Sequence, residues 1–420
     1  MRRTLNFLYL SLIFLSGCGL RTDTASAVGI PTPTPFQPAQ IASDSVYAGS
    51  APTPLSLPTI VPSPVPTLES PTAIPNVEAT PVTLPNPINP LTGLPASDPA
   101  LLNRRALAIK VANYPRYIRP QSGLTLADQV YEYYIEGGLT RFIAVFYGNN
   151  SEWVGPVRSG RFFDENIQRM YQSFIVFKYA DPRVLTYFQS TDFAKFLVVP
   201  SLGISSFGAC PPFQFLESRK IEVYNNSYFN MLKWEPCVEK YNLPSDPPSY
   251  RTDLFSTSYV ANSILAGDLI YTYYSADDYN YWQYVPETGE YARYQETSDT
   301  RDNKPEQFAP LVDRVNGTAV HATNVVVLFA YHTFANAYDA DDEVYHIDLT
   351  GSGEAYVFRD GVGIVARWTR TYVNQPLSLT DPTNGAAISL KPGTTFYEVI
   401  GTNSFVDQDA GEWHFHHTTP

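Results

Sequence analysis

Residues 130–147 read VYEYYIEGGLTRFIAVFY. Residues 130–135 and 142–147 are rich in aromatic and β-branched side chains, which favour strands. Gly137 and Gly138 lie between these runs, and a Gly-Gly pair in that position is typical of a hairpin turn. The stretch therefore predicts two antiparallel strands joined by a tight turn.

The residues around this hairpin alternate between strand and helix patterns. Residues 105–112 and 174–179 are short apolar runs of strand type, and residues 159–171 carry apolar side chains at helical spacing. Asp181-Pro182 is typical of a helix start, and residues 227–241 have the pattern of a further helix. Residues 89–245 are therefore predicted to form a mixed α/β domain.

A second domain is predicted after the Pro-rich stretch 243–250. Residues 251–401 contain short aromatic and β-branched runs separated by turn signals, which predicts a domain made almost entirely of strands. Two units are also expected because about 310 folded residues exceed a typical single domain. The predicted fold class is α+β, with a mixed α/β N-terminal unit, a β-rich C-terminal unit and a polar C-terminal tail at residues 402–420.

The start of the chain has the pattern of an exported lipoprotein. Arg2 and Arg3 precede a short apolar run, and residues 15–18 read LSGC, which resembles the Leu-small-small-Cys box of lipoprotein signals. Residues 1–17 are therefore predicted as a signal peptide and Cys18 as the site of lipid attachment. The expected location is extracytoplasmic, with the protein anchored to a membrane of the cell envelope. An ordinary secretory signal with a chance cysteine is the alternative.

Residues 18–88 are predicted to be a disordered tether. Prolines recur from Pro31 to Pro90, and Lys and Arg are absent between Arg21 and Arg104. Such a composition cannot bury a core and favours extended, polyproline-like conformations. We expect the tether to hold the folded part away from the membrane; a Pro-rich ligand for a recognition domain is the alternative.

The composition limits the partners. The formal net charge of -13 argues against nucleic acid as a partner. No metal site and no cofactor are expected, because the sequence shows neither metal-ligand spacing nor a phosphate-binding loop. With Cys18 acylated, Cys210 and Cys237 remain, and in an exported protein they form a possible disulfide; two buried thiols are the alternative.

Several short motifs resemble one known family. They are, in order, NPLTGLP at 89–95, RPQSGL at 119–124, EGG at 136–138, TRF at 140–142, GPVRSGR at 155–161, LTGSG at 349–353 and LKPG at 390–393. Over most of residues 89–400 the chain is similar to the YerB-like bacterial lipoproteins. The resemblance implies a two-part domain of unknown function, and so it supplies an architecture but no reaction.

The GPVRSGR motif contains the strongest candidate site. Arg158, Ser159 and Arg161 precede a predicted helix, whose free N–H groups would favour an anion. Two guanidinium groups on one face can bind a phosphate or a carboxylate. Arg119 and Arg141 lie on neighbouring segments and are predicted to complete an anion-binding cluster.

The nearby carboxylates allow two interpretations. Asp128 and Glu136 are candidates for an acid or base, or for partners of the arginines. In the structural alternative these two residues, with Glu132 and Asp164, pair with the arginines and only stabilise the fold. No catalytic residue is assigned, because no known catalytic motif is present.

We therefore interpret the protein as a non-enzymatic, lipid-anchored envelope protein. Its predicted partners are the membrane, through the lipid, and an anionic cell-wall component or envelope protein, through the arginines. The alternative is an envelope enzyme that acts on a phosphorylated or acidic glycan.

Overall fold

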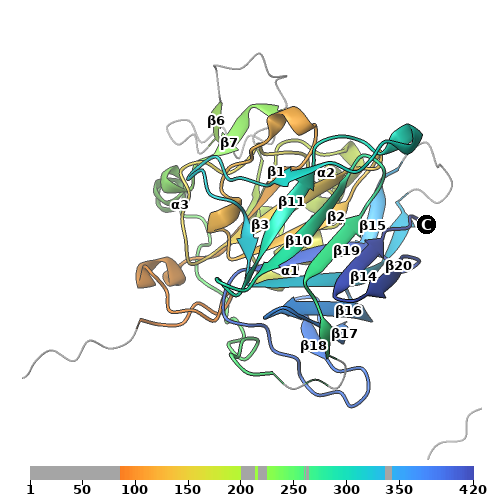
Figure 1. Cartoon of the computed structure of the whole chain (residues 1–420). Coiled ribbons are helices and arrows are strands. Elements are labelled where there is room, and N and C mark those ends of the chain that lie inside the picture. Colours follow the sequence, from red (N-terminus) through yellow and green to blue (C-terminus); the bar gives the residue numbers. More distant parts are fainter. Residues whose placement is uncertain (1–85, 200–212, 216–224, 260, 262–263, 336–342) are drawn as a thin grey trace, which may run out of the picture. The chain divides into compact units, whose positions relative to one another are not determined.

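The computed structural model describes residues 86–199, 213–215, 225–259, 261, 264–335 and 343–420 (Figure 1). The predictions for the signal peptide, for Cys18, for tether residues 18–85 and for Cys210 lie outside the described residues. Within the described part, extensive sheets are accompanied by short helices, which confirms the α+β class.

The predicted hairpin lies in the middle of the larger sheet. Its strands are β2 (Gln129–Tyr134) and β3 (Thr140–Phe146), which pair antiparallel with Tyr133 opposite Arg141. All residues of both strands are buried. The nearly continuous apolar pattern of this stretch follows from that position, because a strand covered on both faces does not need to alternate.

Among the described residues, twelve strands form this larger sheet, whose central order is β18-β17-β16-β14-β19-β2-β3-β1-β4-β5, with β15 beside β14 and β8 beside β17. The other strands are β1 (Leu107–Ala112), β4 (Phe174–Val176), β5 (Leu197–Val198), β8 (Ile264–Ala266), β14 (Asn324–Phe334), β15 (Tyr345–Asp348), β16 (Gly351–Arg359), β17 (Val362–Arg370), β18 (Ser378–Thr380) and β19 (Thr395–Gly401).

The two predicted domains meet inside this sheet. Strand β19 of the C-terminal part pairs parallel with β2 of the N-terminal part, with Thr395 opposite Gln129. The predicted boundary at 243–250 therefore does not separate two independently packed bodies. The strand patterns on each side were recognisable locally, but their pairing joins segments far apart in the sequence.

A second sheet of seven strands in the described residues packs against the first. It contains the last two strands of the chain, so the prediction that residues 402–420 form a tail is wrong. Trp413 of this segment is 2% exposed and contacts Phe358 of the larger sheet. The strands are β9 (Leu269–Tyr273), β10 (Tyr279–Val285), β11 (Glu290–Glu296), β12 (Phe308–Pro310), β13 (His321–Ala322), β20 (Phe405–Asp409) and β21 (Glu412–His416).

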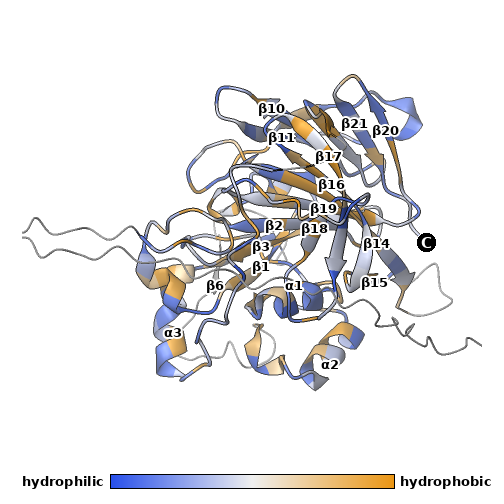
Figure 2. Cartoon of the chain, turned by 90° about the horizontal axis from the view of Figure 1, so that it is seen from below, coloured by the Kyte–Doolittle hydropathy of each residue, from blue (hydrophilic) through white to orange (hydrophobic). Residues whose placement is uncertain are grey.

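The helices lie on the opposite face of the larger sheet, as Figure 2 shows. They are α1 (Asp164–Tyr171), α2 (Pro182–Ser190) and α3 (Glu235–Lys240). The predicted helix at 159–171 thus begins later than expected. The predicted helix at 227–241 is also wrong in its first part, which forms β7 (Ser227–Phe229) paired with β6 (Phe213–Phe215). Short 3-10 helices are η1 (Pro99–Asn103), η2 (Arg116–Ile118), η3 (Leu124–Leu126), η4 (Ala194–Phe196), η7 (Met231–Lys233) and η8 (Arg301–Asn303).

Alternation along β2 distributes side chains between the two layers. Tyr131 and Tyr133 face the helices, where Tyr131 contacts Tyr171 and Tyr133 contacts Phe163. Glu132 faces the second sheet and pairs there with Arg293. Successive residues of a strand point to opposite faces, so one short strand supplies both the wall of the candidate site and a charge in the core.

Candidate functional site

The GPVRSGR motif forms an extended segment beside the larger sheet. Val157 bridges to Val111 of β1, and the amide of Arg158 donates to the carbonyl of Lys110 at 3.2 Å. On its other side, Gly160 bridges to Ala180 after β4. This position between two segments brings the motif next to the first residues of β3, where Arg141 lies.

The structure brings together three of the four predicted arginines. The guanidinium of Arg141 is 7% exposed and donates to the carbonyl oxygen of Ser159 at 2.9 Å. Burial, followed by the nearby charges of Arg161 and Arg158, lowers the pKa of Arg141 well below its usual value. Glu136 and Asp164 oppose this shift but do not cancel it.

Glu136 lies at the solvent edge of this cluster. Its two carboxylate oxygens accept hydrogen bonds from Nε and Nη2 of Arg161, and Arg141 lies 4.0 Å away. Burial raises the pKa of Glu136, but the guanidinium of Arg161 outweighs this effect and holds the pKa below its usual value. Glu136 is thus an ionised partner of the arginines, and its side chain is 40% exposed.

A buried Lys–Asp pair, which the sequence analysis missed, lies beneath the arginines. Nζ of Lys110 lies 2.7 Å from Asp164, and both side chains are almost fully buried. Nζ also lies 3.9 Å from the centre of the Tyr133 ring, and the Tyr133 hydroxyl donates to Asp164 at 2.5 Å. Burial lowers the pKa of Lys110 to about 7 against the opposing effect of Asp164. Lys110 lies inside the apolar strand β1, and nothing in the local sequence indicated that it would pair with Asp164.

The start of α1 does not provide the predicted anion seat. Asp164, its first residue, accepts a hydrogen bond from the backbone amide of Arg161 at 2.8 Å. The first amides of the helix, those of residues 164–166, already donate to the backbone carbonyls of residues 161–163, so they are not free to bind an anion. The anion-binding capacity of this region resides in the guanidinium groups.

Arg119 is positioned elsewhere. It donates to the side chain of Glu296 at 2.7 Å and to the carbonyl of Asn113 at 3.1 Å. With Arg116 it lines a separate cleft of about 510 Å³ beside β12. Burial raises the pKa of Glu296 to about 7, since the effect of burial exceeds that of Arg119. The prediction that Arg119 joins the other arginines is therefore wrong, because an ion pair fixes it to the second sheet.

Asp128 is also remote from the arginine cluster, because it accepts hydrogen bonds from the amides of Tyr147 and Gly148 and from Asn89 at 2.8 Å. Burial raises its pKa. The carboxylate therefore joins the start of the folded chain to the end of β3. Its prediction as an arginine partner at the site is wrong.

The two sheets enclose an ion cluster that the sequence did not indicate. Arg293 of β11 lies 2.5 Å from Glu132 of β2 and 2.8 Å from Glu398 of β19, and all three side chains are 0% exposed. Burial raises the pKa of Glu132 well above its usual value, although Arg293 opposes this shift. The cluster joins side chains from three separate strands and is closed to solvent, so its role is to stabilise the fold.

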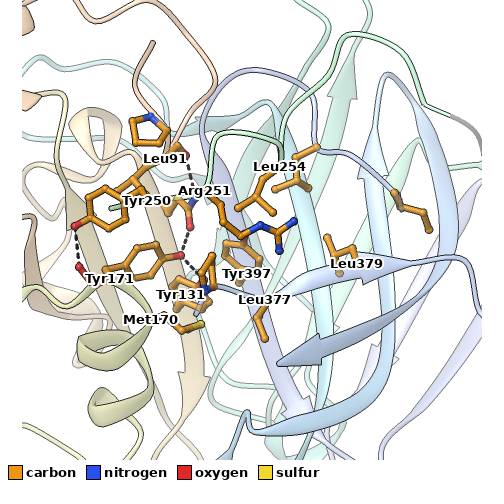
Figure 3. Close-up of a pocket in the computed structure, with 15 residues that line it drawn as sticks. Leu91, Tyr131, Met170, Tyr171, Tyr250, Arg251, Leu254, Leu377, Leu379 and Tyr397 are labelled. Carbon is orange, nitrogen blue, oxygen red and sulfur yellow. Dashed lines mark hydrogen bonds between the residues drawn. The ribbon is translucent and has the colours of Figure 1, made fainter. Parts of the chain in front are cut away.

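A small cavity lies where the NPLTGLP motif meets the larger sheet (Figure 3). Its volume is about 30 Å³, which is room for a water molecule or two and not for a larger ligand. Tyr131 stacks on Tyr397 with ring centres 4.2 Å apart, and its hydroxyl lies 2.6 Å from that of Tyr171. This cavity is therefore a small packing gap between the motif and the sheet, and not a ligand site.

The remaining predictions concern Cys237 and metals. Cys237 is buried in α3 and is disulfide-bonded. Cys18 and Cys210 lie outside the described residues, so the pairing of Cys210 with Cys237 stays a prediction.

Across the described ranges, no group of three or more His, Cys, Asp or Glu residues is arranged to hold a metal ion. In the same ranges, no helix has both the length and the apolar surface needed to cross a membrane.

Comparison with known proteins gives consistent matches. Two family models, described as the N-terminal and C-terminal domains of a protein of unknown function (DUF3048), match residues 91–235 and 270–397. The Bacillus subtilis (strain 168) protein named "Putative lipoprotein YerB" is 26% identical over 327 residues, which cover 74% of this chain and 85% of that protein. The crystal structure of YerB protein from Bacillus subtilis has a TM-score of 0.58 and 24% identity, and covers 75% of this chain and 97% of that one.

Proposed function

This chain belongs to the DUF3048 family, as its resemblance to the YerB-like lipoproteins indicated, and from that premise we propose that it is a lipid-anchored envelope protein that binds an anionic cell-wall component. The lipid would be attached at Cys18, and residues 18–88 would form the tether. The anion would bind at Arg141, Arg158 and Arg161.

The main observation in support of an anion site is the electrostatic environment of Arg141. Its guanidinium is desolvated and is flanked by Arg158 and Arg161, and this arrangement lowers its pKa. An anion placed between these groups would offset the repulsion and form charge-assisted hydrogen bonds, which contribute about 1.5–3 kcal/mol each. Glu136 now partly fills this role for Arg161. A ligand would therefore compete with Glu136 at the exposed edge of the cluster.

A wall polymer suits the site better than a small enclosed substrate. Glu136, which pairs with Arg161, has a side chain that is 40% exposed, so an extended molecule could approach the cluster from that side. Repeated phosphate or carboxylate groups would then add to the affinity through neighbouring contacts. Binding should weaken with salt, since exposed charges are screened within about 8 Å at physiological ionic strength.

The proposal is tested by surface plasmon resonance with a poly(glycerol phosphate) polymer and with purified peptidoglycan. The double variant R158Q/R161Q should bind at least about tenfold more weakly. The control R183Q/R251Q removes the same charge from two exposed arginines that pair with Asp181 and Asp253. Equal affinities for the two double variants would refute the anion site.

Replacement of the competing carboxylate gives an independent test with the opposite sign. The substitution E136Q removes the negative charge that holds Arg161, so the affinity for either polymer should rise. If Glu136 and Arg161 formed only a structural pair, E136Q would lower the melting temperature and leave binding unchanged. Such a result would count against the proposal.

The anchor is tested separately. The substitution C18A should move the protein from the membrane fraction to the soluble fraction, because the acylated thiol would be the membrane attachment. The second variant C237A loses a cysteine that is disulfide-bonded in the folded part, and it should remain in the membrane fraction. Unchanged fractionation of C18A would end the lipoprotein proposal.

A further inference from the structure

A second cleft, of about 440 Å³, lies between α1 and the outer face of β14 and β15. Tyr331 pairs with Asp348 and Thr333 with His346 across these strands. Residues directly opposite each other in an antiparallel pair point to the same face, so these four side chains share one surface. The alternate residue Ile347 is buried. Strand alternation therefore builds a polar and aromatic wall above a closed core.

Arg370, the last residue of β17, forms the buried end of this cleft. Its side chain is 2% exposed, and its Nη1 donates to Asn166 at 2.8 Å. Its other hydrogen bonds go to backbone carbonyls, including that of Leu349 at 3.2 Å. In the part of the chain that the structure describes, Nε has no hydrogen-bond partner and Arg370 forms no ion pair, although the charge of Asp348 lies close enough to raise its pKa.

A buried guanidinium without a carboxylate is unusual in a protein core, because the desolvation cost of a charge is normally met by a paired opposite charge. Burial lowers the pKa of Arg370 to about 10, and the nearby charge of Asp348 offsets this shift only in part. The side chain lines the cleft, so a negative group bound there would lie beside the guanidinium and could supply the missing partner.

The remaining walls suit a sugar ring. Tyr331 is 61% exposed, and Phe162 stacks on His346 with ring centres 4.1 Å apart. Exposed aromatic rings provide flat apolar surfaces, while Thr333 and Asp348 can bind hydroxyl groups. A pocket with aromatic walls and a few fixed polar groups is typical of a small-molecule site.

We propose that this cleft binds a hexose residue that carries an anionic group, with the ring against Tyr331 and the charge on Arg370. Phe162 of the cleft directly follows Arg161 of the arginine cluster, so one extended chain can occupy both places. The inference rests on the proposed function in one respect: it identifies the wall component as an acidic or phosphorylated glycan. The arginine cluster would bind the repeating charges, and the cleft would select the sugar.

Isothermal titration calorimetry of the full chain with three short ligands tests this site. The ligands are a galacturonic acid trisaccharide, glucose 6-phosphate and a neutral galactose trisaccharide. We expect at least one charged ligand to bind about tenfold more tightly than the neutral one, and the better of the two identifies a carboxylate or a phosphate as the anionic group. Equal binding of the charged and neutral sugars, or no binding of any of them, overturns the proposal.

Two substitutions locate the binding. R370K keeps the charge but removes Nε, and Y331A removes an exposed ring without disturbing the core; each should weaken the charged sugar about tenfold. If R370K fails to fold, the affinity of Y331A for the charged sugar still tests the site. The matched control is Y117A, at an exposed tyrosine that lines the other cleft, and it should have no effect. Unchanged affinity in Y331A refutes the site.

The outcome is separable from that of the proposed function. The variant R158Q/R161Q should lose affinity for the polymer but keep its affinity for the short charged sugar. If instead polymer binding is unchanged in R158Q/R161Q while Y331A weakens the short sugar, the arginine cluster is refuted and the cleft stands. Loss of short-sugar binding in both variants refutes a separate sugar subsite.

Discussion

The ion cluster between the sheets gives the strongest test of how this fold is stabilised. The substitution R293M removes a guanidinium that lies 2.5 Å from Glu132 and 2.8 Å from Glu398. Methionine fills part of the volume but leaves two carboxylates in a site with 0% exposure. Removal of one member of a buried ion pair costs about 3–5 kcal/mol, so the free energy of unfolding at pH 7 should fall by that amount.

The loss should depend on pH. In the parent, burial already raises the pKa of Glu132 against the effect of Arg293, and without Arg293 this pKa should rise further. The folded variant then binds protons between pH 7 and 5 that the unfolded chain, with ordinary glutamates, does not bind. Stability therefore increases as the pH falls, by up to about 1.4 kcal/mol per pH unit for each extra proton. R293M should thus lie closer to the parent at pH 5 than at pH 7.

Urea unfolding followed by tryptophan fluorescence at both pH values measures these quantities. The triple variant E132Q/R293M/E398Q is the matched control, because it removes the charges together and should recover most of the lost stability. A loss below about 1 kcal/mol for R293M at pH 7, or an equal loss at both pH values, would refute the argument that uncompensated charge sets the cost.

Three further predictions concern single positions. Burial lowers the pKa of His332 to about 4, so as the pH falls below about 6.5 the unfolded chain takes up a proton before the folded chain does, and stability is lost toward pH 4. H332F should therefore reduce the dependence of the free energy of unfolding on pH, measured by urea titration. An unchanged pH dependence would contradict this prediction. At Gly393, where φ is +146°, an added Cβ would lie 2.0 Å from Oγ1 of Thr323, so G393A should lower the melting temperature by several degrees. Gly317 also has a positive φ, but an added Cβ there would meet no atom within 4 Å, so G317A should lower the melting temperature less. Asp313 accepts hydrogen bonds from two separate loops, so D313A should cost about 2–4 kcal/mol by urea unfolding, and a cost under about 1 kcal/mol would show that water replaces it.

The candidate site was recognisable in part from local sequence. Arg158 and Arg161 lie in one short motif, and Arg141 follows the hairpin turn less than twenty residues earlier, so two nearby stretches of sequence contain all three arginines. Arg119 was assigned to the same cluster because it is near in sequence. Its ion pair with Glu296 joins it to another sheet, and no local pattern encodes that choice.

The sequence alone determined the hairpin, most strand positions and the α+β class, because turn geometry and side-chain branching act over a few neighbouring residues. The tertiary structure decided which strands became neighbours. Thr395 pairs with Gln129, and Arg370 reaches a cleft beside α1, through contacts between segments that are distant in the chain. Such contacts depend on burial and charge compensation summed over the whole core, and these are properties of the assembled layers that no single stretch of sequence contains.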